Sequence, residues 1–190
     1  AQVDEAERFF GSLDTRLPTQ TNRSEEQIEW QQFATPPRLA WLAARACALA
    51  TGEFVLEPSA GTGMLAVWAV KAETRLALNE ISPLRRDCLI AAFPTARVTG
   101  HDAELIDELL DPAVAPSAVL MNPPYSHGIE RGHDGRTGAR HLRSAWSRLA
   151  PGGRLVAIMP EWFDCRRFLA GVKGPVALRL NAAVERAFIK

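Results

Sequence analysis

Short apolar runs alternate with longer amphipathic stretches along most of the chain. Runs of four to six residues are typical of buried strands, whereas apolar residues that repeat every three or four positions are typical of helices. The runs expected to form strands lie at 53–57, 75–79, 96–99, 118–121, 154–159 and 175–180. The stretches expected to form helices lie at about 3–17, 24–33, 36–50, 64–71, 82–93, 103–110, 141–149 and 161–170. This alternation predicts an α/β fold, a doubly wound and mostly parallel sheet with helices on both faces.

Residues with special backbone preferences mark the ends of the helix expected at 36–50. Thr35 is a good N-cap, and Pro36 suits the first helical position. Gly52 is expected to end this helix, because glycine favours the left-handed conformation that follows many helices. The expected core face carries Leu39, Leu42, Ala43, Ala46 and Leu49.

Composition bounds the class of protein. A chain of 190 residues with 47% hydrophobic residues fits one domain with a sizeable core, and its formal net charge of zero gives no overall basic footprint for nucleic acid. Cys47, Cys88 and Cys165 lie far apart in the sequence, so we expect small buried apolar residues rather than metal ligands. We see no secretory signal and no apolar run long enough to span a membrane, and we expect a cytoplasmic protein without membrane contact.

A glycine turn follows the first expected strand, in the order Pro58-Ser59-Ala60-Gly61-Thr62-Gly63. A strand, a glycine turn and a helix form the ligand-binding half of a βαβ unit, in which glycine lets a ligand approach the backbone. The third glycine of a dinucleotide fingerprint is absent, since Ala66 stands there, and Glu57 favours a ligand with an amine over a phosphate. The alternative is that the glycines serve turn geometry alone.

Acids also follow the next two expected strands. Glu80 lies about 20 residues beyond the glycine turn, where an acid can bind the hydroxyls of a ribose. Asp102 could accept a hydrogen bond from an adenine amino group. The alternatives are a solvated carboxylate for Glu80 and an N-cap of the following helix for Asp102.

The fourth expected strand runs into Asn122-Pro123-Pro124-Tyr125. Two prolines cannot continue a sheet ladder, so the strand must stop there. The Asn122 side-chain oxygen and the Pro123 carbonyl can accept the two N–H bonds of a planar amine, and Tyr125 can stack on its ring. Such a grip suits methylation of a conjugated amine, because it favours the tetrahedral nitrogen of the transition state. The alternative is a Pro-Pro turn with an Asn cap.

Residues 126–140 are rich in glycine, histidine and arginine, and we expect a long loop directly after this tip. Arg131, Arg136 and Arg140 make the local charge positive, which suits contact with a nucleic-acid backbone; the alternative is a solvated loop. The histidines of this part of the chain lack the carboxylate or cysteine neighbours of a metal site, so no metal is expected; they are His127, His133 and His141.

Taken in order, these motifs resemble the class I S-adenosylmethionine-dependent amino-methyltransferases of the N6-adenine DNA type. The resemblance covers about residues 32–160. It implies a Rossmann-like methyltransferase fold, S-adenosylmethionine as cofactor, and a nucleic-acid partner, DNA before others. The residues that it implies at the cofactor are Phe33, Thr35, Pro36, Glu57, Ala60, Gly61, Gly63, Glu80, Ile81, Asp102, Ala103 and Asn122.

The same resemblance assigns the target base to Asn122, Pro123, Pro124 and Tyr125. We find no cysteine near this tip, which argues against the 5-methylcytosine route. A target base inside a duplex would have to be flipped out of the stack. Two alternatives keep the tip but change its use: methylation of an RNA base or a protein glutamine amide, and a non-catalytic module that binds cofactor or nucleic acid.

Residues 31–63 and 152–158 resemble, more narrowly, the methyltransferase domain of strawberry-notch-like methylase–helicase proteins. That resemblance implies that the fold continues past Lys190 into an antiparallel last strand, and we expect this chain to stop before it. We therefore expect an N-terminal helical extension at 1–31 and a methyltransferase domain at 32–190, together a fragment of a longer protein whose further domains are its partners.

Overall fold

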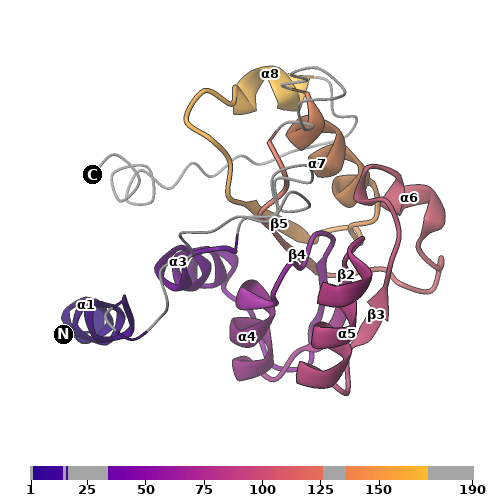
Figure 1. Ribbon diagram of the computed structural model, residues 1–190. Helices are drawn as coiled ribbons and strands as arrows, with labels where there is room; N and C mark the ends of the chain where they lie inside the picture. Colours follow the sequence, from indigo (N-terminus) through magenta and orange to yellow (C-terminus); the bar gives the residue numbers. More distant parts are fainter. Residues whose placement is uncertain (1, 15, 17–33, 126–135, 171–190) are drawn as a thin grey trace.

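A parallel sheet forms the centre of the molecule (Figure 1). The computed structural model describes residues 2–14, 16, 34–125 and 136–170. In this part of the chain five strands pair in the order β3-β2-β1-β4-β5, and every pairing is parallel. The strands are β1 (Phe54–Glu57), β2 (Arg75–Asn79), β3 (Arg97–Thr99), β4 (Ala118–Met121) and β5 (Arg154–Ala157). The prediction of a doubly wound parallel sheet is confirmed, and the strand expected at 175–180 lies outside the described residues.

Helices cover both faces of the sheet. Figure 1 shows α3, α4 and α5 on one side of the strands and α6, α7 and α8 on the other. The helical segments are α1 (Gln2–Asp14), α3 (Pro37–Cys47), α4 (Met64–Lys71), α5 (Pro83–Ala92), the 3₁₀ turn η1 (Ala103–Leu105), α6 (Ile106–Leu109), α7 (Thr137–Ser147) and α8 (Cys165–Ala170). The helix expected at 24–33 lies outside the described residues.

Each layer of helices closes its own apolar core. Alternate side chains of a strand point to opposite faces, so Val55 packs towards α3, α4 and α5 while its neighbour Leu56 packs towards α6, α7 and α8. In β4, Leu120 and Met121 divide in the same way. Strands that are apolar on both faces are what a parallel sheet between two helical layers requires.

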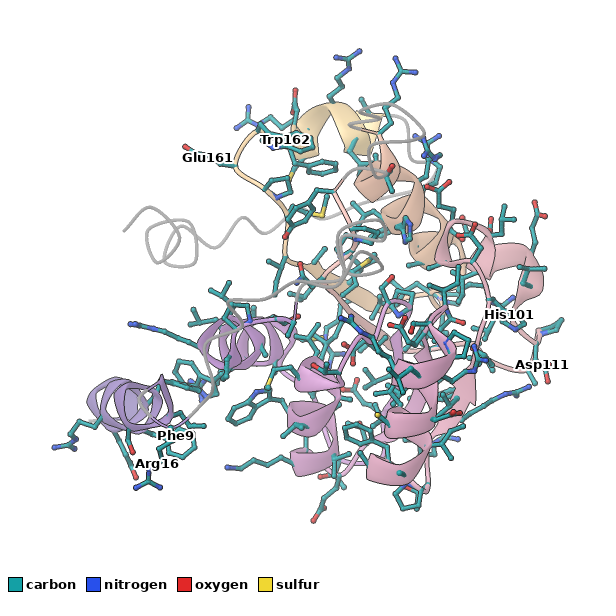
Figure 2. The ribbon with its side chains drawn as sticks, viewed as in Figure 1. Phe9, Arg16, His101, Asp111, Glu161 and Trp162 are labelled. Atoms are coloured by element: carbon teal, nitrogen blue, oxygen red, sulfur yellow. The ribbon has the colours of Figure 1, made fainter. Side chains whose placement is uncertain are left out.

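The N-terminal helix α1 contacts α3 and α4 through aromatic rings. Phe10 of α1 is buried, and its ring centroid lies 5.7 Å from that of Trp41 on α3 and 6.3 Å from that of Trp68 on α4. Phe9, labelled in Figure 2, stays exposed on the same helix. The amphipathic helix expected at 3–17 is confirmed, although it ends at Asp14.

The boundaries of α3 differ from those expected. Pro36, not Thr35, is the N-cap residue, and the helix begins at Pro37. The reason is steric, because a residue that precedes proline is pushed out of the helical region, and Pro36 accordingly has ψ 137°. Of the expected core face, Ala43 is buried and Leu39 and Leu49 pack against the core, but Ala46 is exposed. Ala40 and Cys47 are buried as well.

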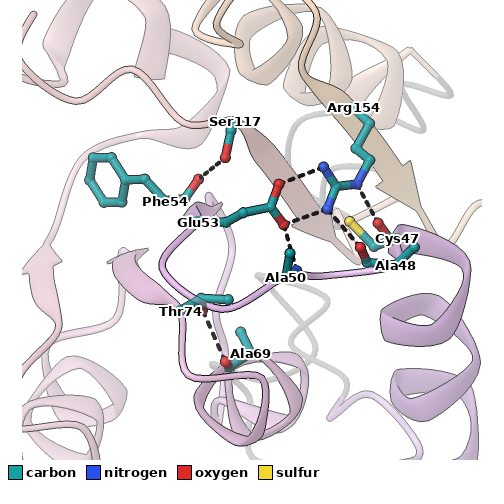
Figure 3. A network of polar contacts seen from close by, with 9 residues as sticks. All are labelled: Cys47, Ala48, Ala50, Glu53, Phe54, Ala69, Thr74, Ser117 and Arg154. Atoms are coloured by element: carbon teal, nitrogen blue, oxygen red, sulfur yellow. Dashed lines mark hydrogen bonds and ion pairs between the residues drawn. The ribbon is translucent and has the colours of Figure 1, made fainter.

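The carboxyl end of α3 is held by Arg154 of β5, not by Gly52. The helix ends at Cys47, and Ala48 takes the left-handed conformation with φ 49°. The Arg154 guanidinium donates to the Cys47 and Ala48 carbonyls and forms an ion pair with Glu53, with Nη1 2.7 Å from Oε1 (Figure 3). These contacts lower the pKa of Glu53, chiefly through the hydrogen bond from Arg154. One side chain therefore ties β5 and α3 to the start of β1.

Candidate functional site

The predicted site residues that the structure describes gather at the carboxyl ends of the strands. In the strand order, β1 lies between β2 and β4, and the chain crosses from one half of the sheet to the other at this point. Ligands of open α/β sheets bind in the crevice at such a switch point, outside the carboxyl ends of the strands. The glycine turn follows β1 and the Asn122–Tyr125 tip follows β4, so the two segments come from neighbouring strands at this switch point.

The glycine turn is fixed by backbone hydrogen bonds to the neighbouring strand end. Ala60 N–H donates to the Asn79 carbonyl at 2.8 Å, and Gly61 N–H donates to a Glu80 carboxylate oxygen at 2.7 Å. Gly61 and Gly63 have φ 56° and 81°, which favour glycine. A Cβ on Gly63 would lie 2.5 Å from the Phe93 ring. Turn geometry and packing against Phe93 both require Gly63, and close approach of a ligand to this turn stays a prediction.

Glu57 is a buried acid at the end of β1. Its side chain is 3% exposed, and Oε2 has no hydrogen-bond partner among the described residues. Burial raises the pKa of Glu57 well above its ordinary value of 4.5, and the nearby Glu80 raises it further, while a hydrogen bond from the Ala66 N–H opposes the shift. A buried carboxylate needs a partner, so this environment fits a ligand that brings an amine or ammonium group.

Glu80 is buried too, so the alternative of a solvated carboxylate is wrong. Its two oxygens accept hydrogen bonds from Gly61 N–H at 2.7 Å and Ser82 N–H at 2.9 Å. Burial raises the pKa of Glu80, against the effect of these two bonds and of the Arg85 and Arg86 charges. Each carboxylate oxygen keeps a further lone pair for a hydroxyl, and the ribose role remains a prediction. The adjoining Ile81 is exposed.

Asp102 follows β3 and caps the next helical turn. Its Oδ1 accepts the Glu104 N–H at 2.9 Å, which confirms the N-cap interpretation. The side chain is exposed, while the adjoining Ala103 is buried. The predicted contact between Asp102 and an adenine amino group is compatible with this cap, because the carboxylate retains a free oxygen, and it stays a prediction.

Asn79 joins three strand ends, a role that was not predicted. The residue is 1% exposed, and its amide donates to the Pro58 and His101 carbonyls at 3.0 and 2.9 Å. Its oxygen accepts from the Thr99 hydroxyl and the His101 N–H, both at 2.8 Å. His101 is labelled in Figure 2. All four hydrogen bonds of the amide are made, so Asn79 fixes the ends of β1, β2 and β3 relative to one another. A lone amide at the end of an apolar strand was the signal for this role.

The Asn122–Tyr125 tip begins where β4 stops, as the two prolines predicted. The Asn122 Nδ2 donates to the Thr35 hydroxyl at 3.1 Å, and the Tyr125 hydroxyl donates to Asn122 Oδ1 at 2.9 Å. The Tyr125 hydroxyl also lies 3.3 Å from the Ile158 carbonyl oxygen. Half-burial of the ring raises the pKa of Tyr125. Thr35, expected as a helix cap, therefore contacts the tip instead, and the link between them was not predicted.

The three predicted nucleic-acid contacts do not share one loop. Arg131 lies outside the described residues, as does Phe33, predicted at the cofactor. Arg136 directly precedes α7, and Arg140 lies within that helix. The expected loop at 126–140 is therefore wrong from Thr137 onward. The Arg140 side chain forms an ion pair with Glu104, and binding of nucleic acid by these arginines stays a prediction.

The three cysteines differ in burial. Cys47 is buried, which raises its pKa to about 11, but Cys88 is exposed and Cys165 half-buried, so the expected burial holds for Cys47 alone. His141 is buried on α7, with Nε2 3.8 Å from Glu104. Among the described residues no three His, Cys, Asp or Glu side chains gather as a metal site would need. In the same part of the chain no helix has the length and apolar character that a membrane crossing requires.

No family model matches the chain. A ribosomal RNA small subunit methyltransferase C from Chromohalobacter salexigens is 28% identical over 123 residues, which are 65% of this chain and 36% of that protein. The crystal structure of TrmN from Thermus thermophilus superposes with a TM-score of 0.53 and 23% identity, covering 70% of this chain and 41% of the other.

A type I restriction-modification methyltransferase subunit from Streptococcus thermophilus superposes with a TM-score of 0.54 and 17% identity, covering 66% of this chain and 34% of the other. The chain has the Rossmann-like fold of S-adenosylmethionine-dependent methyltransferases. It spans about a third of the curated relative and well under half of either structure. Since one fold hosts many functions, the chemistry of this chain must be argued from its own site.

Proposed function

We propose that this chain transfers a methyl group from S-adenosylmethionine to an exocyclic amine, and that the amine is N6 of adenine in DNA. The observation that carries the proposal is the pairing of two half-sites on neighbouring strands. A buried acid, Glu57, ends β1, and the Asn122 amide with the Pro123 carbonyl follows the end of β4. A methyl donor held by the first would lie beside an amine held by the second.

The donor side of the crevice fits S-adenosylmethionine. Glu57 offers a buried oxygen that has no hydrogen-bond partner in the described part of the chain, and a ligand ammonium would supply one. Glu80 would bind the ribose and Asp102 the adenine amino group, while Gly61 and Gly63 shape the turn between them. Thr35 and Pro36, with Phe33, would border the methionine end, and Ala60, Ile81 and Ala103 would line the pocket. When bound, the cofactor would supply an electrophilic methyl group and leave as S-adenosylhomocysteine, while the methylated amine loses one N–H proton.

The acceptor side of the crevice fits a planar amine. The lone pair of a conjugated amine is delocalised into its ring, so the amine is a poor nucleophile. Asn122 Oδ1 and the Pro123 carbonyl would accept its two N–H bonds and favour the tetrahedral nitrogen over the flat one. The Tyr125 hydroxyl occupies one lone pair of Asn122 Oδ1, and the second lone pair remains for the substrate. The Tyr125 ring would stack on the base.

Two observations support a nucleic acid as substrate, and one favours DNA. The curated relative is named for ribosomal RNA and one structural neighbour for restriction-modification. The form Glu57-Pro58-Ser59-Ala60-Gly61 and the segment 33–36 resemble the N6-adenine DNA type. A base reached inside a duplex would have to be flipped out, which costs least where the strand is already single.

Transfer of a labelled methyl group from S-adenosylmethionine tests the proposal. The acceptors are single-stranded DNA, duplex DNA, RNA and a mixture of denatured proteins, and labelled DNA is digested to nucleosides. We expect label in DNA, recovered as N6-methyladenine. Label in RNA alone or in glutamine side chains would overturn the DNA assignment. Cofactor binding without transfer to any acceptor would overturn the enzyme assignment.

A further inference from the structure

We propose that the ion pair between Glu104 and Arg140 is a positioning link that holds the first turn of α7 against the Asn122–Tyr125 tip and thereby sets the rate of methyl transfer. This inference rests on the proposed function. It assigns to both residues a role in the reaction that needs no contact with substrate or cofactor, in place of the nucleic-acid contact predicted for Arg140.

The pair has the geometry of a strong, directional contact. Arg140 Nε lies 2.7 Å from Glu104 Oε2, and Arg140 Nη2 lies 2.9 Å from Oε1. Two parallel hydrogen bonds of this kind fix the angle between the partners as well as their distance. The Glu104 side chain is 18% exposed and that of Arg140 39%, so solvent screens the attraction in part, and the contribution is orientation more than energy.

One end of the link lies against the tip. The first turn of α7 contains Thr137, whose hydroxyl is 3.3 Å from Arg140 Nη2, and Gly138, which is buried. A Cβ on Gly138 would lie 3.4 Å from the Pro124 carbonyl oxygen and 3.9 Å from the Tyr125 Cα. The helix backbone thus packs directly on the tip, and a shift of α7 would move the residues that hold the amine.

The other end of the link is anchored at the end of β3. Glu104 belongs to η1, which is capped by the Asp102 carboxylate through the Glu104 N–H. The ion pair therefore connects the end of β3, where Asp102 is predicted to contact adenine, to α7, which packs on the Asn122–Tyr125 tip. His141, with Nε2 3.8 Å from the same carboxylate, adds a second side chain of α7 to this contact.

A second polar contact between the same elements provides a matched control. The Ser144 hydroxyl donates to Asp107 Oδ1 at 2.7 Å and accepts the Asp107 N–H at 3.0 Å. It joins α6 to α7 as the ion pair joins η1 to α7, but it lies further along α7 from the tip. Loss of this contact would loosen the two helices without releasing the first turn of α7.

The experiment compares Arg140→Gln, Glu104→Gln, their double variant and Ser144→Ala in the same chain. For each variant we would measure kcat, KM for nucleic acid, the cofactor Kd and the midpoint of thermal unfolding. We expect kcat to fall roughly tenfold in both single variants, because small misplacements of reacting groups are costly, with the cofactor Kd changed by less than about twofold. The double variant should be no slower than either single one, while Ser144→Ala lowers the midpoint and leaves kcat unchanged.

A spectroscopic signal tests the same link without activity. The chain contains one tyrosine, Tyr125, so 3-fluorotyrosine labelling gives a single ¹⁹F resonance from the tip. We expect both single ion-pair variants to shift or broaden this resonance and Ser144→Ala to leave it in place. If the resonance responds in this way but the chain transfers no methyl group, the link is retained and the proposed function is rejected. An unmoved resonance, or an Arg140→Gln effect on KM for nucleic acid and its salt dependence alone, would overturn the link.

Discussion

The Tyr125 hydroxyl donates a hydrogen bond of 2.9 Å to the side-chain oxygen of Asn122. The Asn122 amide in turn donates to the Thr35 hydroxyl at 3.1 Å. Both ends of the amide are therefore held by hydroxyl groups, which keep the amide group in place at the tip. In this orientation the oxygen keeps a lone pair for an amine, as the proposed chemistry needs.

Replacing Tyr125 with phenylalanine should separate stacking from orientation. The ring stays, but the bond to Asn122 is lost, which should lower the free energy of unfolding by roughly 0.5–1.5 kcal/mol. We expect methyl transfer to slow by a similar free energy, about threefold to tenfold, while Tyr125→Ala, which also removes the stacking face, is slower still. Equal rates for the two variants, measured at saturating cofactor, would show that the ring does not stack on the substrate.

Replacing Glu57 with glutamine should change the pH dependence of stability. The pKa of Glu57 is raised in the folded protein, so its contribution is fully present below the ordinary value of 4.5 and is lost as the pH rises through the folded value. Without ligand, the wild type should therefore lose stability relative to Glu57→Gln as the pH rises above 4.5. Denaturant unfolding of both proteins at a series of pH values measures this difference.

Bound cofactor should reverse the order of stability, so that the wild type becomes more stable than Glu57→Gln. An ammonium beside Glu57 favours the ionised carboxyl group, so binding should release a proton from Glu57 and tighten as the pH rises. Titration calorimetry in buffers of different ionisation enthalpy would detect that proton in the wild type and not in Glu57→Gln. Equal proton release in both would place the ammonium elsewhere.

The ribose role of Glu80 needs a test that allows for its second function, because its carboxylate also holds Gly61 and Ser82. Loss of cofactor affinity in Glu80→Gln alone could reflect a disturbed turn. We expect an analogue without ribose hydroxyls to bind the wild type less tightly, by roughly 1.5–3 kcal/mol for hydrogen bonds to a charged group. For Glu80→Gln, the difference in binding free energy between S-adenosylmethionine and this analogue should be much smaller. The same penalty in both proteins would refute the contact.

Gly63→Ala and Gly61→Ala form a matched pair for the glycine turn. Both positions have positive φ, but a Cβ at Gly63 would lie 2.5 Å from the Phe93 ring, and one at Gly61 meets only Arg85 Nη1 at 3.7 Å. Backbone strain of about 1–2 kcal/mol should affect both, and overpacking should add about 1–3 kcal/mol at Gly63. Urea unfolding measures both values, and equal losses would contradict the packing role of Phe93.

Local patterns predicted most of the frame. The bounds of β2, β4 and α4 match the expected segments. Gly63 marks the start of α4, and Pro116 and Pro123 lie on either side of β4. The acids at the ends of β1 and β2 were identified from their positions after those runs. The burial of Glu80 was not predicted, because burial depends on how segments distant in the sequence pack around the side chain.

Contacts between distant segments were not predictable from local patterns. Thr35 and Asn122 are 87 positions apart, and Glu104 and Arg140 are 36 apart. Thr35 looked like a helix cap, and Arg140 looked like a loop residue in a basic stretch. Neither pair has a spacing along the chain that indicates a contact. The fold brings Thr35 at the start of α3 to the end of β4, and it brings η1 to α7 within one helical layer.

The most direct test of the central claim measures methyl transfer and cofactor affinity on the same preparations of the wild type and Asn122→Ala. In the proposed function the amine lies at the end of β4 and the cofactor chiefly at the ends of β1, β2 and β3. We therefore predict that transfer to adenine in DNA falls by at least roughly 10²-fold, while the cofactor Kd changes by less than about twofold. Transfer that persists in Asn122→Ala, or affinity that falls together with the rate, would contradict it.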